Sequence, residues 1–591
     1  MPVESTSTKT NVVTLTIDGV EVKTTKGKRI LEAALDNGIY IPNLCSLRDI
    51  RLPYGACRLC QVQIEGRKGF VTACSEPAAE GMIIHSNIPE VNAMRRKILH
   101  IMLARHPFVC LECHRRERCK PGDTCLRLIS VNEQQCIICP NNGRCQLQRA
   151  VDFIGLGEMP YPYTYKGYRI ERENPFVVRN NNLCILCGRC VRVCQEILGI
   201  EAISFNRRGR DTFVGGAFGR PLLESGCTFC GSCVEVCPTG ALKNVGDEWE
   251  RWHDPKAAWI RCQHNCPARV DVPRFIRFIR ERKYNEALAV IQEKVPFALI
   301  CSRICSHPCE RACRRNDLDQ GLAIRALERF AAERASIKPT IEGKAPASGK
   351  KVAIIGSGPA ALTAAYYLTK KGGHAVTVFE SEAQAGGMLR TAPEYDLPRQ
   401  ILDDELEMLK RLGVEMKTQA RVDSADRLFQ DGFQAVFVAG DAPKMAELGI
   451  TISSDGLGTS RKGVFAVSEV VSDKHIFIKG VAEGRKAAIT IDQYLGGSGN
   501  IEEVLAPVQE GIPRIGRMPN FAQRKRVTMP TASVEQSKDK SAKVELGFPD
   551  AAGSEEALRC MSCDIRFMVA KFVAQPPLSV QSRKTLIIDN E

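Results

Sequence analysis

The alternation of apolar and polar residues changes character along the chain. Residues 12–24, VVTLTIDGVEVKT, alternate around Asp18-Gly19, which indicates a β-hairpin with a two-residue turn. Residues 29–39, RILEAALDNGI, carry apolar residues at helical spacing and close on a glycine, so we expect an amphipathic helix there. Two strands and a packed helix predict a β-grasp domain.

The second half of the chain shows two other patterns. Residues 272–335 have a helical period, and residues 336–350, SIKPTIEGKAPASGK, have the composition of a linker. KVAIIGSGP at 351–359 is typical of a buried strand that enters a glycine-rich turn, and strands and helices alternate from there to about residue 496. The predicted fold class is therefore multidomain, α+β followed by α/β.

Length and composition limit the function classes. A chain of 591 residues suggests three to five domains, and 44% hydrophobic with 25% charged residues is ordinary for soluble globular protein. No run of eighteen apolar residues occurs, so we expect no membrane span. The polar start MPVESTSTKTN predicts a disordered tail over residues 1–11 and no export, and hence a cytoplasmic protein.

The cysteine content changes this picture. The chain holds 27 cysteines, an odd number with repeated CxxC spacing, which argues for thiolate ligands to metal in a reducing compartment rather than disulfides. The formal net charge of +14 counts them as neutral. An oxidised cluster with four thiolates carries roughly −2, so several clusters would cancel most of the excess. The basic balance therefore does not indicate nucleic-acid binding.

The first cysteine group follows the predicted hairpin and helix. Its spacing of eleven, two and thirteen residues does not match a zinc finger, although structural zinc is the alternative reading. Four thiolates after such a fold suit one [2Fe–2S] centre. The expected ligands are Cys45, Cys57, Cys60 and Cys74.

A later region repeats the bacterial ferredoxin spacing CxxCxxCxxxC twice, in CILCGRCVRVC and CTFCGSCVEVC. The fourth cysteine of each run in such proteins ligates the other cluster. One [4Fe–4S] cube is therefore expected on Cys184, Cys187, Cys190 and Cys237, and the other on Cys227, Cys230, Cys233 and Cys194.

Between these regions, HPFVCLECHRRERC resembles the amino-terminal part of the large iron–sulfur subunit of respiratory complex I, which also occurs in iron-only hydrogenases and NAD-dependent formate dehydrogenases. In that family a β-grasp [2Fe–2S] domain precedes a [4Fe–4S] cluster with one histidine ligand. The resemblance implies that the ligands here include His106, Cys110, Cys113 and Cys119.

The chain departs from that family by adding Cys125, Cys136, Cys139 and Cys145, the last three of which repeat the two-five spacing. Either this histidine–cysteine motif is duplicated, so that eight ligands bind two clusters, or a single motif carries an insertion with spare thiols. We favour two clusters, because idle thiols beside a cluster are open to oxidation. Which cysteine belongs to which cluster stays open.

A fourth group resembles the amino-terminal domain of the glutamate synthase small subunit, on RCQHNCPARVDVPRF, CSRICSHPCERAC and AIRALERF. That family starts the domain with a CxxC, which is missing upstream here, whereas ALRCMSC at 557–563 has its signature. We therefore expect the carboxyl terminus to fold back. The resemblance implies one cluster on Cys560, Cys563, Cys262 and Cys313, and another on Cys266, Cys305 and Cys309 with Glu328 or Cys301 as fourth ligand.

The glycine-rich turn has the form GxGxxA, and an acidic residue stands about twenty residues on. Such a turn admits a pyrophosphate to a helix amino terminus, and the acid accepts from ribose hydroxyls. Together with AQAGGMLRTAPEYDLP it resembles the FAD turn of the same flavoprotein family. The implied FAD-binding residues are Gly356, Gly358, Pro359, Ala361, Glu380, Gly387, Met388, Leu389 and Glu469.

Two departures from that family bear on the flavin domain. The second FAD contact is usually a Gly-Gly-Asp, and Val467, Ser468 and Glu469 stand there instead; a Rossmann domain without nucleotide is therefore the alternative. The family also inserts an NADPH domain between its two FAD halves. Here AVFVAGDAPKMAELGI is followed almost at once by SRKGVFAVSEVV, and the stretch between them is too short to form such a domain. We expect no NADPH binding of the family's kind.

These readings divide the chain into seven segments. They are a tail (1–11), a β-grasp [2Fe–2S] domain (12–88), a His/Cys [4Fe–4S] region (89–160), a ferredoxin-like domain with two [4Fe–4S] clusters (161–250), a helical two-cluster domain (251–345), an FAD domain without NADPH insertion (346–505) and a carboxyl-terminal tail whose CxxC returns to the helical domain (506–591). One [2Fe–2S], six [4Fe–4S] and one FAD are expected.

The favoured function is an electron-relay subunit of a multi-subunit oxidoreductase, with no catalytic acid, base or nucleophile of its own. Expected partners are an NADH-oxidising flavoprotein, a thioredoxin-like [2Fe–2S] subunit, ferredoxin and a formate dehydrogenase or hydrogenase, and bifurcation is a special case. The alternatives are a self-contained NAD(P)H-dependent flavin reductase and a cluster scaffold whose flavin fold only docks a partner.

Overall fold

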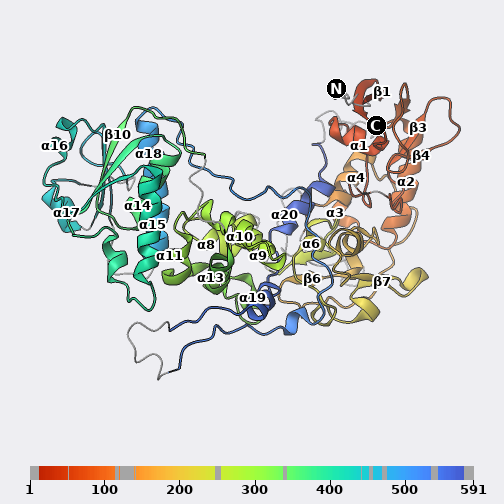
Figure 1. Ribbon diagram of the computed structural model, residues 1–591. Helices are drawn as coiled ribbons and strands as arrows, with labels where there is room; N and C mark the ends of the chain where they lie inside the picture. Colours follow the sequence, from red (N-terminus) through yellow and green to blue (C-terminus); the bar gives the residue numbers. More distant parts are fainter. Residues whose placement is uncertain are drawn as a thin grey trace, which may run out of the picture. The chain divides into compact units, whose positions relative to one another are not determined.

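The computed structural model describes residues 12–48, 50, 52–113, 119, 139, 141–245, 255–336, 343–440, 442–451, 457–468, 476–533 and 544–577. It divides into two compact units, which Figure 1 shows as ribbons. The first comprises Met1–Pro255, Gly511–Gln523 and Met561–Glu591, and the second Lys256–Glu510 and Arg524–Cys560. The tail expected at residues 1–11 lies outside the described residues.

The first unit begins with a five-stranded sheet in the order β2-β1-β5-β3-β4. The predicted hairpin is confirmed, because β1 and β2 pair antiparallel through a turn with positive φ at Asp18 and Gly19. The predicted helix is confirmed as α1, which buries its apolar face against this sheet. The elements are β1 (Val12–Ile17), β2 (Val20–Thr25), α1 (Ile30–Asp36), β3 (Gln61–Ile64), β4 (Val71–Thr72) and β5 (Ile83–His85).

The remainder of the first unit consists of short elements joined by cysteine-bearing loops. Two-stranded sheets form from β6 with β9 and from β7 with β8. The elements are α2 (Pro89–Leu103), α3 (Val109–Glu112), α4 (Gln146–Ile154), β6 (Val177–Arg179), α5 (Arg189–Arg192), β7 (Ser204–Asn206), β8 (Phe213–Gly215), α6 (Ser232–Glu235), β9 (Leu242–Asn244) and α20 (Ile565–Val569).

Two segments of the carboxyl-terminal region also belong to the first unit. The backbone N–H of Ile515 donates to Leu198 O at 2.9 Å, and Arg566 on α20 pairs with Glu235 on α6 at 2.8 Å. The sequence predicts that the carboxyl-terminal tail returns to the helical domain. No motif in the sequence predicts that parts of this tail also pack on the first unit.

The second unit starts with a helical region, as the period of residues 272–335 predicted. Asp271 caps α9 by accepting from the backbone N–H of Arg274 at 3.3 Å, and α9, α10 and α13 bury a common apolar core. The helices are α7 (Pro255–Trp259), α8 (Arg261–Asn265), α9 (Val272–Arg280), α10 (Tyr284–Gln292), α11 (Ala298–Ile304), α12 (Pro308–Arg311) and α13 (Ile324–Arg334).

A parallel sheet in the order β12-β11-β10-β13-β14 follows. The strand that comes first in the sequence, β10, lies at the centre of this sheet, as in one half of a doubly wound nucleotide-binding fold. The elements are β10 (Lys351–Ile355), α14 (Pro359–Lys370), β11 (Ala375–Phe379), α15 (Arg399–Leu412), β12 (Glu415–Lys417), α16 (Ala425–Gln430), β13 (Ala435–Gly440), α17 (Ala442–Glu447), β14 (Val464–Ser468) and α18 (Ile476–Tyr494).

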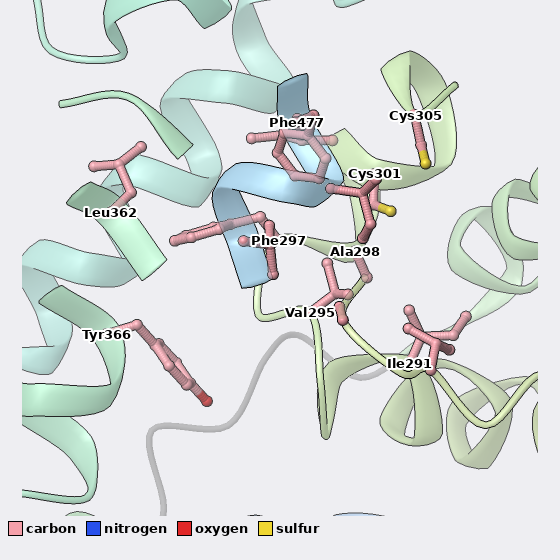
Figure 2. Close-up of a cluster of buried hydrophobic side chains, with 14 of the residues drawn as sticks. Ile291, Val295, Phe297, Ala298, Cys301, Cys305, Leu362, Tyr366 and Phe477 are labelled. Atoms are coloured by element: carbon pink, nitrogen blue, oxygen red, sulfur yellow. The ribbon is translucent and has the colours of Figure 1, made fainter. Parts of the chain in front are cut away.

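One apolar core joins this sheet's helices to the helical region. Figure 2 shows Phe297 and Phe477 beside Cys301 on α11, with Leu362 and Tyr366 projecting from α14. Helix α11, which carries Cys301 and ends just before Cys305, therefore packs directly against the Rossmann-like region.

A buried ion pair at the carboxyl end of α19 (Asp550–Ala557) ties this segment to the helical region. Arg559 pairs with Glu556 at 2.8 Å, and both side chains are fully buried. Glu556 accepts from the backbone N–H of Ala323 at 2.9 Å. Arg559 donates to Gln320 O at 2.7 Å and pairs with Asp319 at 3.1 Å. These contacts hold the segment that precedes Cys560 against the helices.

Arg559→Met should loosen this segment. The substitution leaves Glu556 buried without its cation, which costs about 3–5 kcal/mol for a broken buried pair. Hydrogen exchange of the α13 and α19 amides in the full chain should show opening that is easier by that amount. Arg517→Met is the control, because the pair of Arg517 with Glu201 is exposed and should matter little. Unchanged exchange in Arg559→Met would contradict the assignment.

Candidate metal centres

Two pockets in the first unit are lined by the cysteines of the ferredoxin-type repeat. The lining of the first cavity includes four thiols. They are Cys184, Cys187 and Cys190 from the first run and Cys237 from the second. The other lining residues are mostly apolar, so the cavity offers four sulfur donors in a water-poor site.

The second cavity is lined by Cys227, Cys230 and Cys233 of the second run and Cys194 of the first. Cys194 lies in a π-helical turn, Val193–Ile197, that continues α5. Such a turn adds one residue to the helical circuit and is frequent at functional sites. The two cavities thus each take three thiols from one run and one from the other.

The loops around the two cavities have the same backbone conformation. Leu186 and Phe229, each before the second cysteine of its run, have φ of 56° and 55°, a region that bulky residues rarely adopt. Each donates its backbone N–H to a thiol two residues earlier, Leu186 to Cys184 Sγ and Phe229 to Cys227 Sγ, both at 3.4 Å. The chain thus turns its amides toward sulfur, which suits anionic ligands.

The first cysteine group lies in the loop before β3 and at the end of β4, and all four side chains are buried. The N–H of Leu44 donates to Cys57 Sγ, and that of Cys57 donates to Cys45 Sγ, each at 3.4 Å. Hydrogen bonding with the Cys45 thiol lowers the pKa of Cys57 to about 6. Cys60 and Cys74 form a second hydrogen-bonded pair, so the four sulfurs converge on one small site.

His106 presents a bare ring nitrogen. Its Nδ1 lies 2.8 Å from Pro107 O, which fixes Nδ1 as the donor, and its buried Nε2 has no hydrogen-bond partner among the described residues. Burial lowers the pKa of His106 to about 4, so the ring stays neutral. A neutral imidazole whose second nitrogen binds a backbone carbonyl is the usual state of a metal-ligating histidine.

The structure brings together cysteines from both halves of the extended His/Cys region. Burial raises the pKa of Cys139 to about 11. The charges of Cys110 and Cys237 add to this effect, and a backbone hydrogen bond from Asn141 opposes it. Burial and the charge of Cys139 raise the pKa of Cys145 to about 12. Cys139 Sγ would lie 2.7 Å from a Cβ at Gly240, so it packs against the segment that follows Cys237.

The rest of this region is described only in part. Cys113 follows α3, and Cys119 O accepts from the Asn142 side chain at 3.0 Å. Cys125 and Cys136 lie outside the described residues.

In the second unit, five donor groups gather around α11 and α13. Cys301 Sγ lies 3.9 Å from Glu328 Oε2, and both are buried. Burial raises the pKa of Cys309, and the nearby charges of Glu328, Cys266 and Cys305 add to it. The expected set of Cys266, Cys305 and Cys309 is therefore close together, with both candidates for the fourth ligand beside it.

Two members of the other expected helical set lie close together in the second unit. Burial raises the pKa of Cys313, and the charge of Cys560 adds to it, so these two thiols are neighbours. Cys262 lies on α8, which packs against α12. Cys563 belongs to the first unit. Ser562, just before Cys563, has φ of 51°, the left-handed conformation that Leu186 and Phe229 adopt in the ferredoxin loops.

The glycine-rich turn lies where β10 meets α14, and no side chain caps the helix at Gly358. The buried carboxylate of Glu380 follows β11 and accepts from the hydroxyl of Ser357 and from the N–H of Glu382, the latter at 3.0 Å. Gly387 approaches the turn so closely that a Cβ there would lie 3.2 Å from Gly358 N. These features fit a bound dinucleotide.

The other expected flavin residues are placed as follows. Pro359 and Ala361 lie in the first turn of α14, and Met388 and Leu389 lie in a 3₁₀ turn, Gly387–Thr391. Val467 and Ser468 end β14, whereas Glu469 lies outside the described residues. The residues described between β13 and β14 form α17 and short connections.

No three histidine, cysteine, aspartate or glutamate side chains among the described residues are close enough to hold a single metal ion. No helix in the described part combines the length and apolarity that crossing a bilayer requires.

Four family models match consecutive parts of the chain. Residues 10–89 match the 2Fe–2S iron–sulfur cluster binding domain, and residues 174–243 match the ferredoxin-like domain of NADH-quinone oxidoreductase subunit 3. Residues 254–339 match dihydropyrimidine dehydrogenase domain II with its 4Fe–4S cluster, and residues 354–405 match the NAD(P)-binding Rossmann-like domain. The chain is thus a mixed α/β multidomain protein with a 2Fe–2S domain, 4Fe–4S ferredoxin-type domains and a Rossmann-like domain.

Curated relatives confirm the resemblance to hydrogenase and formate dehydrogenase subunits. NADPH-Fe(3+) oxidoreductase subunit alpha of Geobacter sulfurreducens is 35% identical over 231 residues, 39% of this chain and 24% of that protein. NADP-reducing hydrogenase subunit HndD of Solidesulfovibrio fructosivorans is 30% identical over 41% of this chain and 37% of that protein. NADP(+)-dependent formate dehydrogenase subunit beta of Moorella thermoacetica is 35% identical over 36% and 34%. The chain spans about a quarter to somewhat over a third of these relatives.

Because each cavity takes one thiol from the other run, double cysteine variants should differ in how many clusters they lose. Cys194→Ala with Cys230→Ala should remove a single [4Fe–4S] cluster, because both line the second cavity. Cys194→Ala with Cys187→Ala should remove two clusters, although the latter pair comes from one run. Iron and sulfide counts on the purified full chain measure the difference. Loss of only one cluster in the second double variant would contradict the crossing.

His106→Cys should lower the midpoint potential of one [4Fe–4S] centre and leave the fold intact. A thiolate carries a negative charge that a neutral imidazole lacks, and this disfavours adding an electron. Redox titration followed by electron paramagnetic resonance (EPR) measures the shift. His85→Cys is the control, because His85 pairs with Glu65 at the surface. An unchanged titration in His106→Cys would remove His106 from the ligands.

Proposed function

We propose that this chain is the electron-relay subunit of a multi-subunit oxidoreductase. The observation that carries the proposal is the pair of cysteine-lined cavities, each completed by a thiol from the other run and both in the same unit as the four-cysteine site. When bound, iron–sulfur clusters accept and release single electrons. The chain's own contribution is to hold the sulfur ligands, exclude water and set the charge around each site.

The proposed ligands of the [2Fe–2S] centre are Cys45, Cys57, Cys60 and Cys74. Their burial and the converging N–H donors support this assignment. The two ferredoxin-type [4Fe–4S] centres take the thiols that line the two cavities.

For the extended His/Cys region we propose two [4Fe–4S] centres. The proximity of Cys110, Cys139 and Cys145 supports a cluster on these three and His106, whose bare Nε2 supplies the fourth donor. The second centre would then use Cys113, Cys119, Cys125 and Cys136. This grouping draws on both halves of the region, so the insertion contributes ligands and leaves no thiol idle.

Two further [4Fe–4S] centres are proposed for the helical region. The first uses Cys262, Cys313, Cys560 and Cys563, supported by the neighbouring thiols of Cys313 and Cys560. The second uses Cys266, Cys305 and Cys309, with Glu328 or Cys301 as fourth ligand, since both lie beside them. The proposed total is one [2Fe–2S] and six [4Fe–4S] centres.

We propose FAD as the dinucleotide of the Rossmann-like region, held at Gly356, Gly358 and the carboxylate of Glu380. The uncapped start of α14 and the close approach of Gly387 support it. The short connection between β13 and β14 supports the absence of a separate NADPH domain. Electrons would then reach the chain through protein partners rather than from NADPH directly.

The proposed partners follow from the relatives. They are an NADH-oxidising flavoprotein, a thioredoxin-like [2Fe–2S] subunit, ferredoxin and a catalytic subunit of formate dehydrogenase or hydrogenase type, in the cytoplasm. The relatives named above are subunits of an NADPH-Fe(3+) oxidoreductase, a hydrogenase and a formate dehydrogenase.

Anaerobic mixing of the purified chain with single reductants tests the relay against the alternatives. We expect reduced methyl viologen to bleach the cluster absorbance, and NADPH or NADH to leave it unchanged. Bleaching by NADPH alone would instead favour the self-contained reductase. Acid extraction of the same sample measures flavin, and its absence alongside intact clusters would favour the scaffold with a flavin-free fold.

A further inference from the structure

The inference concerns Arg189, which stands between two cysteines of the first ferredoxin run. Its side chain is 1% exposed. It donates to Gln146 Oε1 at 2.6 Å and to Asn43 Oδ1 at 3.2 Å. We name Asn43, Gln146 and Arg189 the Arg189 junction.

The junction ties together three ligand-bearing segments of the first unit. Asn43 lies two residues before Cys45, Gln146 directly follows Cys145, and Arg189 directly precedes Cys190. Gln146 is held in turn by its backbone N–H, which donates to Pro238 O at 2.9 Å. One guanidinium therefore fixes the spacing between the [2Fe–2S] loop, the His/Cys region and the first ferredoxin run.

The charge of Arg189 has no carboxylate partner among the described residues, because both of its hydrogen-bond acceptors are neutral amides. Burying an unpaired charge costs several kcal/mol. Arg315 and Arg559, which are equally buried, each pair with a carboxylate. Arg189 thus needs a different source of negative charge.

That source is the sulfur ligands. The cysteine side chains close enough to act on the Arg189 charge are Cys187, Cys45, Cys57 and Cys237. These four belong to two different sites, the first cavity and the [2Fe–2S] group. Its Nε–H is buried and has no hydrogen-bond partner in the described part of the chain, so a donor remains for sulfur.

We infer that Arg189 is a positioning and potential-setting residue shared by the [2Fe–2S] centre and the first [4Fe–4S] centre. Reduction adds one negative charge to either centre, and a buried cation favours that charge by Coulomb attraction at low dielectric. Arg189 therefore raises both midpoint potentials together and lowers the cost of holding electrons on neighbouring centres. The inference rests on the proposed function, because it needs both centres to be present.

Arg189→Met is the main test, since it removes the charge and keeps much of the apolar volume. In EPR redox titrations of the full chain, both centres should become harder to reduce. At a fixed potential the reduced-to-oxidised ratio should fall about tenfold, which is 59 mV for one electron. The two centres are told apart by their EPR signals. The [2Fe–2S] signal persists at higher temperature, and the signal of the first [4Fe–4S] centre is the one that Cys184→Ala loses.

Two variants serve as controls. Arg189→Lys keeps the charge and should restore most of both potentials, which a purely structural role would not predict. Arg192→Met, on the same helix, should shift neither potential much, because Arg192 already pairs with Glu196 at 2.7 Å and that carboxylate is half exposed.

If Arg189→Met does not retain iron, Gln146→Glu decides the question. This change keeps the shape of the acceptor and places a carboxylate on the guanidinium, so both potentials should fall while the loops stay joined. Unchanged potentials, or a shift in only one centre, in an iron-replete variant would overturn the inference. A wild-type chain without a [2Fe–2S] signal would contradict the proposed function instead.

Discussion

The structure of this chain depends on keeping ionised sulfur inside protein. Burial raises the pKa of Cys187 and Cys194 to about 12, so a thiolate there needs a bound cation to exist at neutral pH. The chain supplies part of the compensation through backbone amides aimed at sulfur, as at Leu186 and Phe229. Iron must supply the rest, so ligand groups and their loops have to be formed together.

The same constraint explains the strained backbone at the sites. Left-handed φ at Leu186, Phe229 and Ser562 turns the chain sharply between paired cysteines. Tyr54 covers Gly188, where a Cβ would lie 2.8 Å from the ring, so the glycine leaves room for an aromatic lid over the first run. Local strain of this kind is retained where the surrounding structure requires one geometry.

Much of this could be predicted from the sequence, because ligand spacing is a local property. The two ferredoxin runs imply the crossed sets that line the cavities, and the alternation around Asp18 and Gly19 predicts the first hairpin. Periodicity also predicts the helical region, since its apolar faces recur at helical spacing. The assignment of Cys560 to the helical region came from a missing motif, and the buried pair of Arg559 with Glu556 supplies its physical basis.

Contacts between distant segments could not be predicted in this way. Cys110 and Cys139 act on one another although they are distant in the sequence, and no spacing rule encodes such a contact. The partition of the carboxyl-terminal region between the units depends on pairs such as Arg566 with Glu235, whose residues carry no motif. The role of Arg189 could not be predicted from the sequence, because a single arginine between cysteines is ordinarily a surface residue. Its burial in the structure is what distinguishes it.

The central claim is that the cysteines hold iron–sulfur clusters of two kinds. Mössbauer spectroscopy of the ⁵⁷Fe-enriched chain, purified without oxygen, tests it most directly because it counts iron by cluster type. The account predicts one [2Fe–2S] component for six [4Fe–4S] components. Iron in isolated tetrathiolate sites, or zinc as the main metal in the same sample, would contradict it.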